Sequence, residues 1–482
     1  MGRRGRAARE GRRRPGPVTA RAHPTTAGPR ETGAHAPRGE HTPGPPARRP
    51  GSPAEPPYHP HGGLPWPDAR RVAQGAGRRL TPITLPLRAA IGQVLAAPLT
   101  AAGDLPPFDT SAMDGWAVAG PGPWRLSGQL LAGQRSAEPL AEGWATRIAT
   151  GAALPPGATA VLRREGGHVE HRSGQPTAWL HVLTAHATDP AGPAPGQDIR
   201  PRGQECRVGD ELLAAGTLVG PAALGLAAAA GRDELTVVPG PRADVFVLGD
   251  ELLDAGPPRD GRVRDALGPL LPPWLRALGV EPGEVRRLED DADTLRQAVG
   301  GSTADLIVTT GGTAAGPVDF VRPVLDDLDA ELLVDGVAVR PGHPMLLARL
   351  PSGRPLVGLP GNPLAAVCGL LTLVAPLART LAGRPQPAPR HARLAEDVRA
   401  HATDTRLVPV SLHDLHDLPD VHDFSEKEGE RGTAFARPLR FGGPAMLRGI
   451  ACADAMAVVP PGDSAATRHT QVEILPIATG AL

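Results

Sequence analysis

Hydrophobic positions change their spacing along the chain, and the most informative pattern lies between residues 243 and 382. Short runs of aliphatic and β-branched residues alternate there with stretches at helical spacing. The strand-like runs are 244–248, 306–310 and 356–359, and the helical stretches are 265–278, 292–299, 320–328 and 364–381. Strands and helices that alternate through short glycine-rich loops predict a parallel sheet with helices on both faces.

The segment before this unit changes its pattern twice. Apolar residues have helical spacing at 80–99 and again at 221–230. Between these two stretches, short apolar runs broken by Gly and Pro occur at 124–131, 159–162 and 179–183, which is typical of a small β domain. We therefore expect a β domain that is inserted into a largely helical or extended element.

The segment after the unit begins with a proline-rich linker at 384–389. Its strand-like runs at 406–412, 455–459 and 471–477, without a long helical period, predict a small β-barrel or sandwich. The expected fold class is thus multidomain α/β plus β. The predicted parts are a disordered tail at 1–63, a helical or extended N-terminal domain at 64–107 and 200–240, an inserted β domain at 108–199, a central α/β domain at 241–383 and a C-terminal β-barrel at 390–482.

Composition adds most to this picture at the N-terminus. The 482 residues have no net formal charge, but residues 1–60 contain 12 Arg against 4 acidic residues, together with 13 Pro and 9 Gly. Such a segment cannot bury enough apolar surface to offset the entropy of ordering, so we expect disorder. Its arginines either contact nucleic acid or belong to a solvated extension; the second interpretation is favoured, and a nucleic-acid partner is not expected.

Neither export nor a membrane span is predicted. Pairs of Arg occur in the tail, but no apolar stretch follows them, as an export signal would need. No window of about 18 apolar residues lacks charge. Cys206, Cys368 and Cys452 are far apart in the sequence, which argues against a disulfide framework and a zinc knuckle. We expect a soluble, cytoplasmic protein.

Three predicted strands end in loops of unusual composition. The loops are GDE at 249–251, GGTAAG at 311–316 and PGNP at 360–363. Ligands of open α/β sheets bind outside the carboxyl ends of the strands, so we expect these loops to converge. The GGTAAG loop either binds phosphate through its backbone N–H groups or is a tight turn, and it has neither Walker nor dinucleotide-binding spacing.

Acidic residues follow the same strand ends. Asp250 and Glu251 come after one strand, Asp290 and Asp291 after another, and Asp319 closes the glycine-rich loop. Carboxylates gathered at one edge of a sheet suit a Mg²⁺ ion that bridges phosphates. Capping of a helix is the alternative for Asp291 and for Asp319.

Two other segments are candidates for ligand contacts. The turn RPGHP at 340–344 directs Arg340, and with it His343, toward an anionic ligand. In the insertion, SAMDGW at 111–116 places Asp114 in a turn that contains Gly, and Thr150 and Gly151 form a similar segment. Each of the two insertion segments is equally compatible with an ordinary β-turn.

Taken together, these segments resemble the molybdopterin molybdenumtransferases, the family of bacterial MoeA and of the gephyrin E domain. The matching text is FDTSAMDGWAV at 108–118, IATGAALP at 148–155, DIRPRGQE at 198–205, GDEL at 249–252, TGG at 310–312 with Gly316 and Asp319, RPGHP at 340–344, LPGNP at 359–363 and MLRG at 446–449. Their order and spacing, over about residues 100 to 460, are more specific than any single motif.

The resemblance implies a homodimer of elongated four-domain subunits whose α/β domain binds molybdopterin. It implies that adenylylated molybdopterin is bound, that molybdate is inserted at its dithiolene, and that AMP is released with help from Mg²⁺. Molybdopterin adenylyltransferase and the maturation proteins of molybdoenzymes are the further partners that such a reaction suggests. No membrane partner is expected.

The resemblance also implies roles for individual residues. It gives catalytic roles to Asp114, Glu251, Asp290 and Asp319, of which the last three would hold the metal, although Asp291 competes with Asp290 for its position. The residues implied in binding the pterin substrate are Ser111, Thr150, Gly151, Gly311, Gly312, Thr313, Gly316, Arg340, Gly342, His343, Pro360, Gly361, Asn362 and Pro363. Arg340 and His343 stand where the family often has two lysines.

Departures from the family pattern leave three hypotheses. Ala314 and Ala365 replace serines, Leu267 stands where Asn is common, and Glu205 replaces an Asp. The favoured hypothesis is a working enzyme with a raised demand for molybdate. The alternatives are a divergent paralogue that binds molybdopterin with little or no transferase activity, and a structural scaffold.

Overall fold

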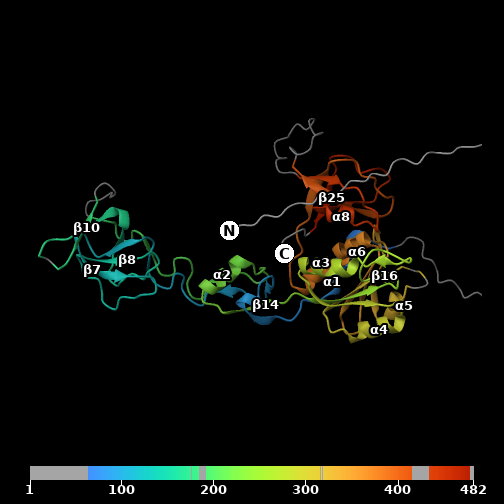
Figure 1. Ribbon diagram of the computed structural model, residues 1–482, viewed down its shortest axis with the longest axis horizontal. Coiled ribbons are helices and arrows are strands. Elements are labelled where there is room, and N and C mark those ends of the chain that lie inside the picture. The colour runs from blue at the N-terminus through green and yellow to red at the C-terminus, as the bar shows by residue number, and fades with distance from the viewer. Residues whose placement is uncertain are drawn as a thin grey trace, which may run out of the picture. The chain divides into compact units, whose positions relative to one another are not determined.

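The computed structural model describes residues 63–174, 176–183, 192–314, 316, 319–414 and 434–477. The predicted disordered tail therefore lies outside the described residues except for Gly63. Figure 1 shows the order of the elements along the chain by colour, with β8 in the cyan part of the ribbon and β25 in the orange part.

A six-stranded sheet forms the centre of the α/β domain. Its order is β18-β15-β19-β23-β22-β20. The first four strands are parallel: β18 (Glu281–Leu288), β15 (Arg242–Leu248), β19 (Leu306–Thr310) and β23 (Pro355–Leu359). The last two, β22 (Leu346–Arg349) and β20 (Glu331–Asp335), continue it in antiparallel pairing. The parallel sheet predicted from the sequence is confirmed, and the antiparallel edge is an addition to it.

Alternating residues of β15 enter two different hydrophobic cores. Val245 and Val247 pack in one core, whereas Phe246 and Leu248 pack in the other. This two-residue period is the sign of a strand that is covered on both faces. One core includes α1 (Trp66–Ala76), α3 (Leu267–Ala277), α6 (Pro363–Gly369), η3 (Leu370–Val374) and α7 (Ala375–Leu381); the other includes α4 (Ala292–Gly301) and α5 (Val321–Asp327).

The stretch Pro363–Leu381 is long and apolar enough to cross a membrane, but 83% of its most apolar window is buried inside the protein. Its middle turn is a π-helix, η3, and every residue of η3 is buried. A helix that is apolar all round and surrounded by protein is the core helix of a globular domain. The buried environment thus accounts for its composition.

Helix α1 packs against the α/β domain, a contact that the sequence-based assignment of residues 64–76 does not include. That assignment places them in the N-terminal domain, but Trp66, Ala69 and Ala73 belong to the same hydrophobic core as α7. The indole N–H of Trp66 donates to the Thr372 hydroxyl at 3.0 Å, and β1 (Leu64–Pro65) pairs with β21 (Val337–Arg340). The buried stripe of α1 is mainly alanine, so hydrophobic spacing gives little signal for it.

The N-terminal domain contains more strand than the apolar spacing at 80–99 indicates. Strands β2 (Ile83–Pro86) and β3 (Val94–Leu95) flank β14 (Glu234–Val238) in an antiparallel sheet, with a short turn, η1 (Leu87–Ala89), between them. A second small sheet joins β4 (Leu99–Thr100) to β13 (Glu211–Leu213). Helix α2 (Pro221–Ala229) lies where helical spacing predicts it.

The insertion is a six-stranded sheet of order β10-β11-β7-β8-β6-β9. The strands are β10 (Gly167–Glu170), β11 (Trp179–Val182), β7 (Trp124–Leu130), β8 (Trp144–Ile148), β6 (Gly115–Val118) and β9 (Ala160–Arg163), with the 3-10 turn η2 (Arg164–Gly166) after β9. Strands β5 (Thr110–Ser111) and β12 (Ile199–Arg200) pair where the chain enters and leaves it. The predicted small β domain is confirmed.

The C-terminal region is a closed β-barrel, as predicted. Pairing runs from β25 (Thr405–His413) through β26 (Phe435–Pro438), β24 (Arg390–Leu394), β28 (Gln471–Pro476) and β27 (Ala455–Val459) back to β25. Helix α8 (Arg448–Ala451) precedes β27. Strand β21 of the preceding domain pairs in parallel with the start of β25, which joins the barrel to the α/β domain.

Trp66 gives a test of the packing of α1 in the main core. Replacing it by Ala should lower the free energy of unfolding by about 3–5 kcal/mol, because a fully packed aromatic side chain is lost from the main core. Arg71→Ala on the exposed face of the same helix should change it by no more than about 0.5 kcal/mol. Chemical denaturation monitored by circular dichroism measures both; a similar small loss for the two variants would contradict the assignment.

Candidate functional site

The carboxyl ends of the parallel strands lie together at one edge of the sheet. Leu248 is in register with Leu288, and Thr310 with Leu359, and each of these is the last residue of its strand. The four chain segments that follow include the loops at 249–251, 311–316 and 360–363. The predicted convergence of these loops therefore follows from the strand register.

Two loops at this edge approach each other through glycines. The N–H of Gly311 donates to the Leu359 carbonyl at 3.0 Å, and a Cβ atom placed on Gly361 would lie 3.6 Å from the Gly311 Cα. Gly311 and Gly312 have φ values of 81° and 62°, which side chains rarely tolerate. Glycine at these positions thus lets the backbone turn sharply from β19 toward α5.

Three other carboxylates lie near enough to Asp290 at the same edge for their charges to act on it. The Asp250 N–H donates to an Asp290 carboxylate oxygen at 3.2 Å, and the Asp290 N–H donates to Asp250 Oδ1 at the same distance. Burial and then the negative charges of Asp250, Glu251 and Asp319 raise the pKa of Asp290 above its usual value. The strand ends therefore bring together the acids that the sequence singles out.

Asp290 and Asp291, which the sequence leaves undecided, have different surroundings. Asp291 is the N-cap of α4, and its Oδ2 accepts from the Thr294 N–H at 2.7 Å. This backbone hydrogen bond and that of the Thr294 hydroxyl lower the pKa of Asp291. Asp290, by contrast, is the one that lies beside the other acids.

Glu251 and Asp319 both fold back on their own loops. A Cβ atom on Gly249, whose φ is 140°, would lie 2.6 Å from Glu251 Oε2. Asp319 Oδ2 accepts from the Gly316 N–H at 2.5 Å, and the Asp319 N–H donates to the Gly316 carbonyl at 3.2 Å. The N-cap of α5 is Phe320, without a side-chain cap, so Asp319 closes the glycine-rich loop and does not cap the helix.

Among the described residues, no three His, Cys, Asp or Glu side chains are grouped closely enough to hold a metal ion by themselves. The three predicted metal ligands, Glu251, Asp290 and Asp319, thus lie near one edge of the sheet. Their carboxylates are not close enough together to coordinate one ion without further ligands. All three supply oxygen, the donor that Mg²⁺ prefers, and Mg²⁺ commonly takes only one or two carboxylates together with substrate phosphates. The residues fit a magnesium ion that binds with a phosphate-bearing substrate.

Two arginines that the sequence analysis does not single out hold the loops in place. Arg322 of α5 donates from Nη1 to the carbonyls of Thr313 and Ala314 and pairs with Asp335 of β20. Arg262, which precedes β17 (Val263–Arg264), donates to the Asp250 carbonyl at 2.7 Å from Nη2 and at 3.1 Å from Nε. Arg322 follows Asp319 by three residues, and this proximity is its only signal in the sequence.

Thr313 and Ala365, two positions of the predicted substrate-binding loops, are both buried. Thr313 is 2% exposed, and its methyl group faces Gly358. Ala365 is 3% exposed, and the N–H groups of Leu364 and Ala365 both donate to the Pro444 carbonyl, at 2.9 and 3.2 Å. The first turn of α6 after Asn362 and Pro363 is therefore already occupied by a loop of the C-terminal region.

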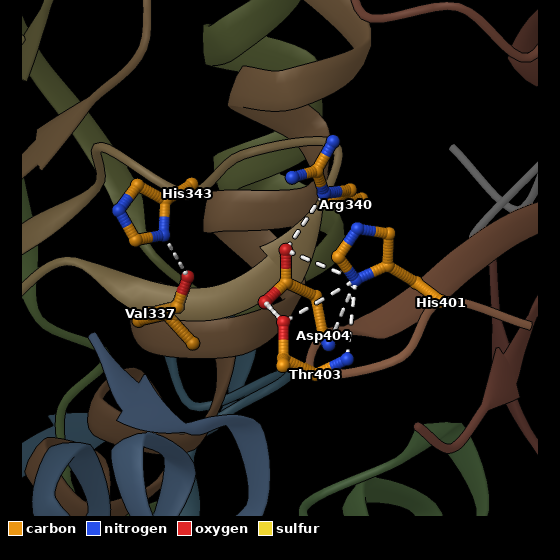
Figure 2. A network of polar contacts seen from close by, with 6 residues as sticks. All are labelled: Val337, Arg340, His343, His401, Thr403 and Asp404. Carbon is orange, nitrogen blue, oxygen red and sulfur yellow. Dashed lines mark hydrogen bonds and ion pairs between the residues drawn. The ribbon is translucent and has the colours of Figure 1, made fainter. Parts of the chain in front are cut away.

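The turn that carries Arg340 faces the barrel, as Figure 2 shows. Arg340 Nε donates to Asp404 Oδ2 at 2.7 Å, while the two terminal nitrogens make no hydrogen bond among the described residues. Burial opposes ionisation of Asp404, but hydrogen bonds from Arg340 and Thr403 hold its pKa below the usual value. One side of the guanidinium is thus committed to Asp404, and the other remains available to an anion.

His343 is exposed, but one of its ring nitrogens is used within the same turn. Its Nδ1 hydrogen-bonds the Val337 carbonyl at 2.8 Å, so the ring lies against its own hairpin (Figure 2). Gly342, with φ of 117°, packs against Met345 and Ala365, which a side chain there would displace. A contact of His343 with an anion therefore stays a prediction that would use its other ring nitrogen.

The insertion contributes a second cluster around Asp114. Asp114 Oδ1 accepts from the backbone N–H of Thr150 at 2.7 Å and from its hydroxyl at 2.9 Å. These two hydrogen bonds lower the pKa of Asp114. Ser111 is buried, donates to the Met113 carbonyl, and accepts at its own carbonyl from Gly151 N–H at 2.8 Å. The hydrogen bonds of Asp114 and Thr150 all stay within the insertion.

Comparison with known proteins identifies the three parts of the chain. Residues 64–231 match the MoeA N-terminal region (domain I and II), 244–380 match the probable molybdopterin binding domain, and 391–477 match the MoeA C-terminal region (domain IV). The three matches follow the order of the two-part N-terminal region, the α/β sheet and the barrel.

Relatives with established names extend the comparison. Molybdopterin molybdenumtransferase from Staphylococcus aureus (strain Mu50) is 30% identical over 341 residues, which are 68% of this chain and 78% of the relative. Molybdopterin molybdenumtransferase 2 from Mycobacterium tuberculosis (strain CDC 1551) is 34% identical over 341 residues, 66% and 80% of the two chains. The crystal structure of the molybdopterin biosynthesis MoeA protein from Pyrococcus horikosii has a TM-score of 0.66 at 25% identity, covering 86% of this chain and 99% of that one.

The Thr150 hydroxyl provides a test of the Asp114 cluster. Thr150→Val removes one of the two hydrogen bonds that stabilise the ionised carboxylate, so the pKa of Asp114 should rise. Because the folded pKa is depressed, the stability that ionised Asp114 contributes is present above its unfolded value and is lost as the pH falls through the folded one. Thr150→Ser keeps the hydroxyl and should leave the pKa unchanged. Carboxyl ¹³C NMR titration measures all three proteins, and equal values for parent and Val variant would refute the contact.

Proposed function

We propose, from the premise that this chain belongs to the MoeA family of molybdopterin molybdenumtransferases, that it inserts molybdate into adenylylated molybdopterin and releases AMP. The protein is a transferase of molybdenum cofactor biosynthesis. The observation that carries the finer proposal is the group of carboxylates around Asp290 beside the glycine-rich loop. Its natural ligand is a divalent cation together with phosphate groups.

In this proposal Asp290, Asp319 and Glu251 hold Mg²⁺ against the phosphates of the adenylylated substrate. A bound Mg²⁺ would supply charge neutralisation at those phosphates when AMP leaves. The position of Asp290 supports this role: burial and then the charges of Asp250, Glu251 and Asp319 raise its pKa, and a bound cation would stabilise its ionised form. The substrate's own oxygens would complete the coordination that these carboxylates begin.

Cationic and backbone donors of the same domain position the anionic substrate. The free terminal nitrogens of Arg340 are suited to a phosphate or to molybdate, since guanidinium groups bind such oxyanions through two parallel hydrogen bonds. In the glycine-rich loop the N–H of Gly311 donates to Leu359 and that of Gly316 to Asp319, so donors to the same anion would come from the amides between them. Arg322 and Arg262 keep the loops at 311–316 and 249–251 in position by donating to backbone carbonyls of these loops.

Molybdate binding is the step that the two alanines affect. Ala314 and Ala365 cannot donate a hydrogen bond, and a missing bond to a charged group costs roughly 1.5–3 kcal/mol when nothing replaces it. Because Thr313 and Ala365 are buried, compensation would come from loop amides and from Arg340. The enzyme should therefore need more molybdate than a relative that has both serines.

The active form in this proposal is a cytoplasmic homodimer. Asp114 and Thr150 form a cluster in the insertion, and the other acids form one in the α/β domain. A partner subunit could supply the insertion cluster to the α/β cleft. Molybdopterin adenylyltransferase would deliver the substrate, and proteins that mature molybdoenzymes would take the product.

Reconstitution tests the function directly. Purified protein is mixed with adenylylated molybdopterin, molybdate and Mg²⁺, and AMP release is followed by chromatography. We expect AMP release that depends on molybdate. Binding of the pterin without AMP release, even at high molybdate, would instead support a binding protein that lacks transferase activity.

Asp319→Asn should reduce Mg²⁺-dependent AMP release by more than roughly 100-fold. Loss of a residue that only hydrogen-bonds a metal ligand typically costs roughly 10- to 100-fold, and loss of a ligand should cost more. The change is nearly isosteric but removes a charged oxygen. Asp291→Asn is the matched control: it lies one residue from Asp290, and Asn caps a helix as well as Asp does, so activity should persist. Equal activity in the two variants would remove Asp319 from the metal site.

The shared site predicts rescue between two inactive chains. Chains with Asp114→Ala and chains with Asp319→Ala, carrying different tags, are co-expressed, and the mixed dimer is purified. If Asp114 acts across the dimer, the mixed dimer has one intact site and regains activity that both parent dimers lack. No activity in a verified mixed dimer would show that each subunit builds its site alone.

A further inference from the structure

An open pocket of about 730 Å³ lies apart from every residue of the candidate site. Three parts of the chain line it: the end of α1 and the residues after it, the end of α7, and the loop that follows β13. Its polar lining consists of Gln74, Arg79, Thr217, Thr380, Arg384 and Gln386. This volume is within the range of small-molecule sites, roughly 300–1,000 Å³.

The charge of this pocket is entirely positive. Arg79 and Arg384 line it, and no Asp or Glu does. Arg379 lies next to it and donates to the Pro385 carbonyl at 3.1 Å. Among the residues that the structure describes, none of these three arginines forms an ion pair. Cations that are drawn together and partly desolvated without a counter-charge are unfavourable unless an anion joins them.

Arg384 is the most confined of the three arginines. Its Nη2 donates to the Gly92 carbonyl at 2.5 Å, and its buried Nε has no hydrogen-bond partner. Gly279, whose φ is 80°, packs against the guanidinium of Arg384. A side chain at this glycine would collide with the guanidinium. Burial and then the charge of Arg379 lower the pKa of Arg384. The protein therefore holds this cation in place at an electrostatic cost.

The C-terminal end of α7 explains only part of this arrangement. Arg379 lies in the last turn of α7, where a positive charge interacts favourably with the helix dipole. Arg79, however, is not on α7: its side-chain carbons pack on Gly383 from the segment after α1. Arg79 thus brings a second, exposed positive charge to the pocket from another element. An anionic ligand would be bound by two such charges.

We infer that this pocket binds a small phosphate-bearing anion. Arg79 and Arg384 reach it from separate segments, and a tetrahedral phosphate offers oxygens to both, whereas a carboxylate offers two oxygens in one plane. The Gln74 amide is a further neutral donor. The pocket is larger than a bare phosphate needs, so a phosphate ester with an organic part fits it better than the free ion.

Binding can be measured on the full-length protein with inorganic phosphate, pyrophosphate, AMP and adenosine as probes. Calorimetry gives the affinity, and hydrogen–deuterium exchange reports protection of peptides that contain 214–217 and 379–386. We expect AMP or pyrophosphate to protect these peptides and adenosine not to. Tighter binding of AMP than of phosphate would identify an ester as the ligand class, and the reverse would identify the free anion.

Arg79→Gln is the decisive variant because Arg79 is exposed and its loss should not disturb folding. It should weaken binding about 10- to 100-fold, as expected for the loss of one hydrogen bond between charged groups. Arg78→Gln, an exposed neighbour outside the pocket, removes the same charge and should have no such effect. Equal weakening by both variants, or no protection of these peptides by any phosphate probe, would overturn the inference.

Discussion

The partial burial of Asp290 beside three other carboxylates is the constraint on which the rest of the site depends. Burial is the main cause that raises the pKa of Asp290, and repulsion from the negative charges of Asp250, Glu251 and Asp319 adds to it. The ionised form of Asp290 is therefore disfavoured at this edge of the sheet. A folded protein keeps such a group when a cation relieves the repulsion during function. The scaffold must therefore hold the acids in place without neutralising them.

The surrounding structure meets this requirement through contacts to backbone atoms. Arg262 donates to a backbone carbonyl of the loop at 249–251, and Arg322 donates to one of the loop at 311–316. Among the described ion pairs, none joins an arginine to Asp290 or Asp319. Gly311 and Gly312 allow the sharp turn, and the buried helix that begins at Pro363 fixes the third loop. The carboxylates thus keep their places at the edge of the sheet while hydrogen bonds to backbone atoms fix the loops that carry them.

The sequence predicts those parts of the protein that depend on local pattern. Strands such as 306–310 and the acids after them can be located because a buried strand is a continuous apolar run and its end is marked by Gly. Long-range contacts are different. The pairing of Arg340 with Asp404, 64 residues away, and the packing of the alanine stripe of α1 on α7 leave no periodic signal. Asp290 could be separated from Asp291 only when the N-cap of α4 was visible.

The account depends most directly on the response of Asp290 to a cation. Carboxyl ¹³C NMR can follow its titration in the protein alone and with Mg²⁺ and AMP, with Asp291 as the internal reference. We predict a pKa above the usual Asp value in the protein alone and a clear decrease when Mg²⁺ and AMP are added, while Asp291 stays low throughout. A normal pKa in the protein alone, or one that does not respond to Mg²⁺ and AMP, would contradict a metal site at this edge of the sheet.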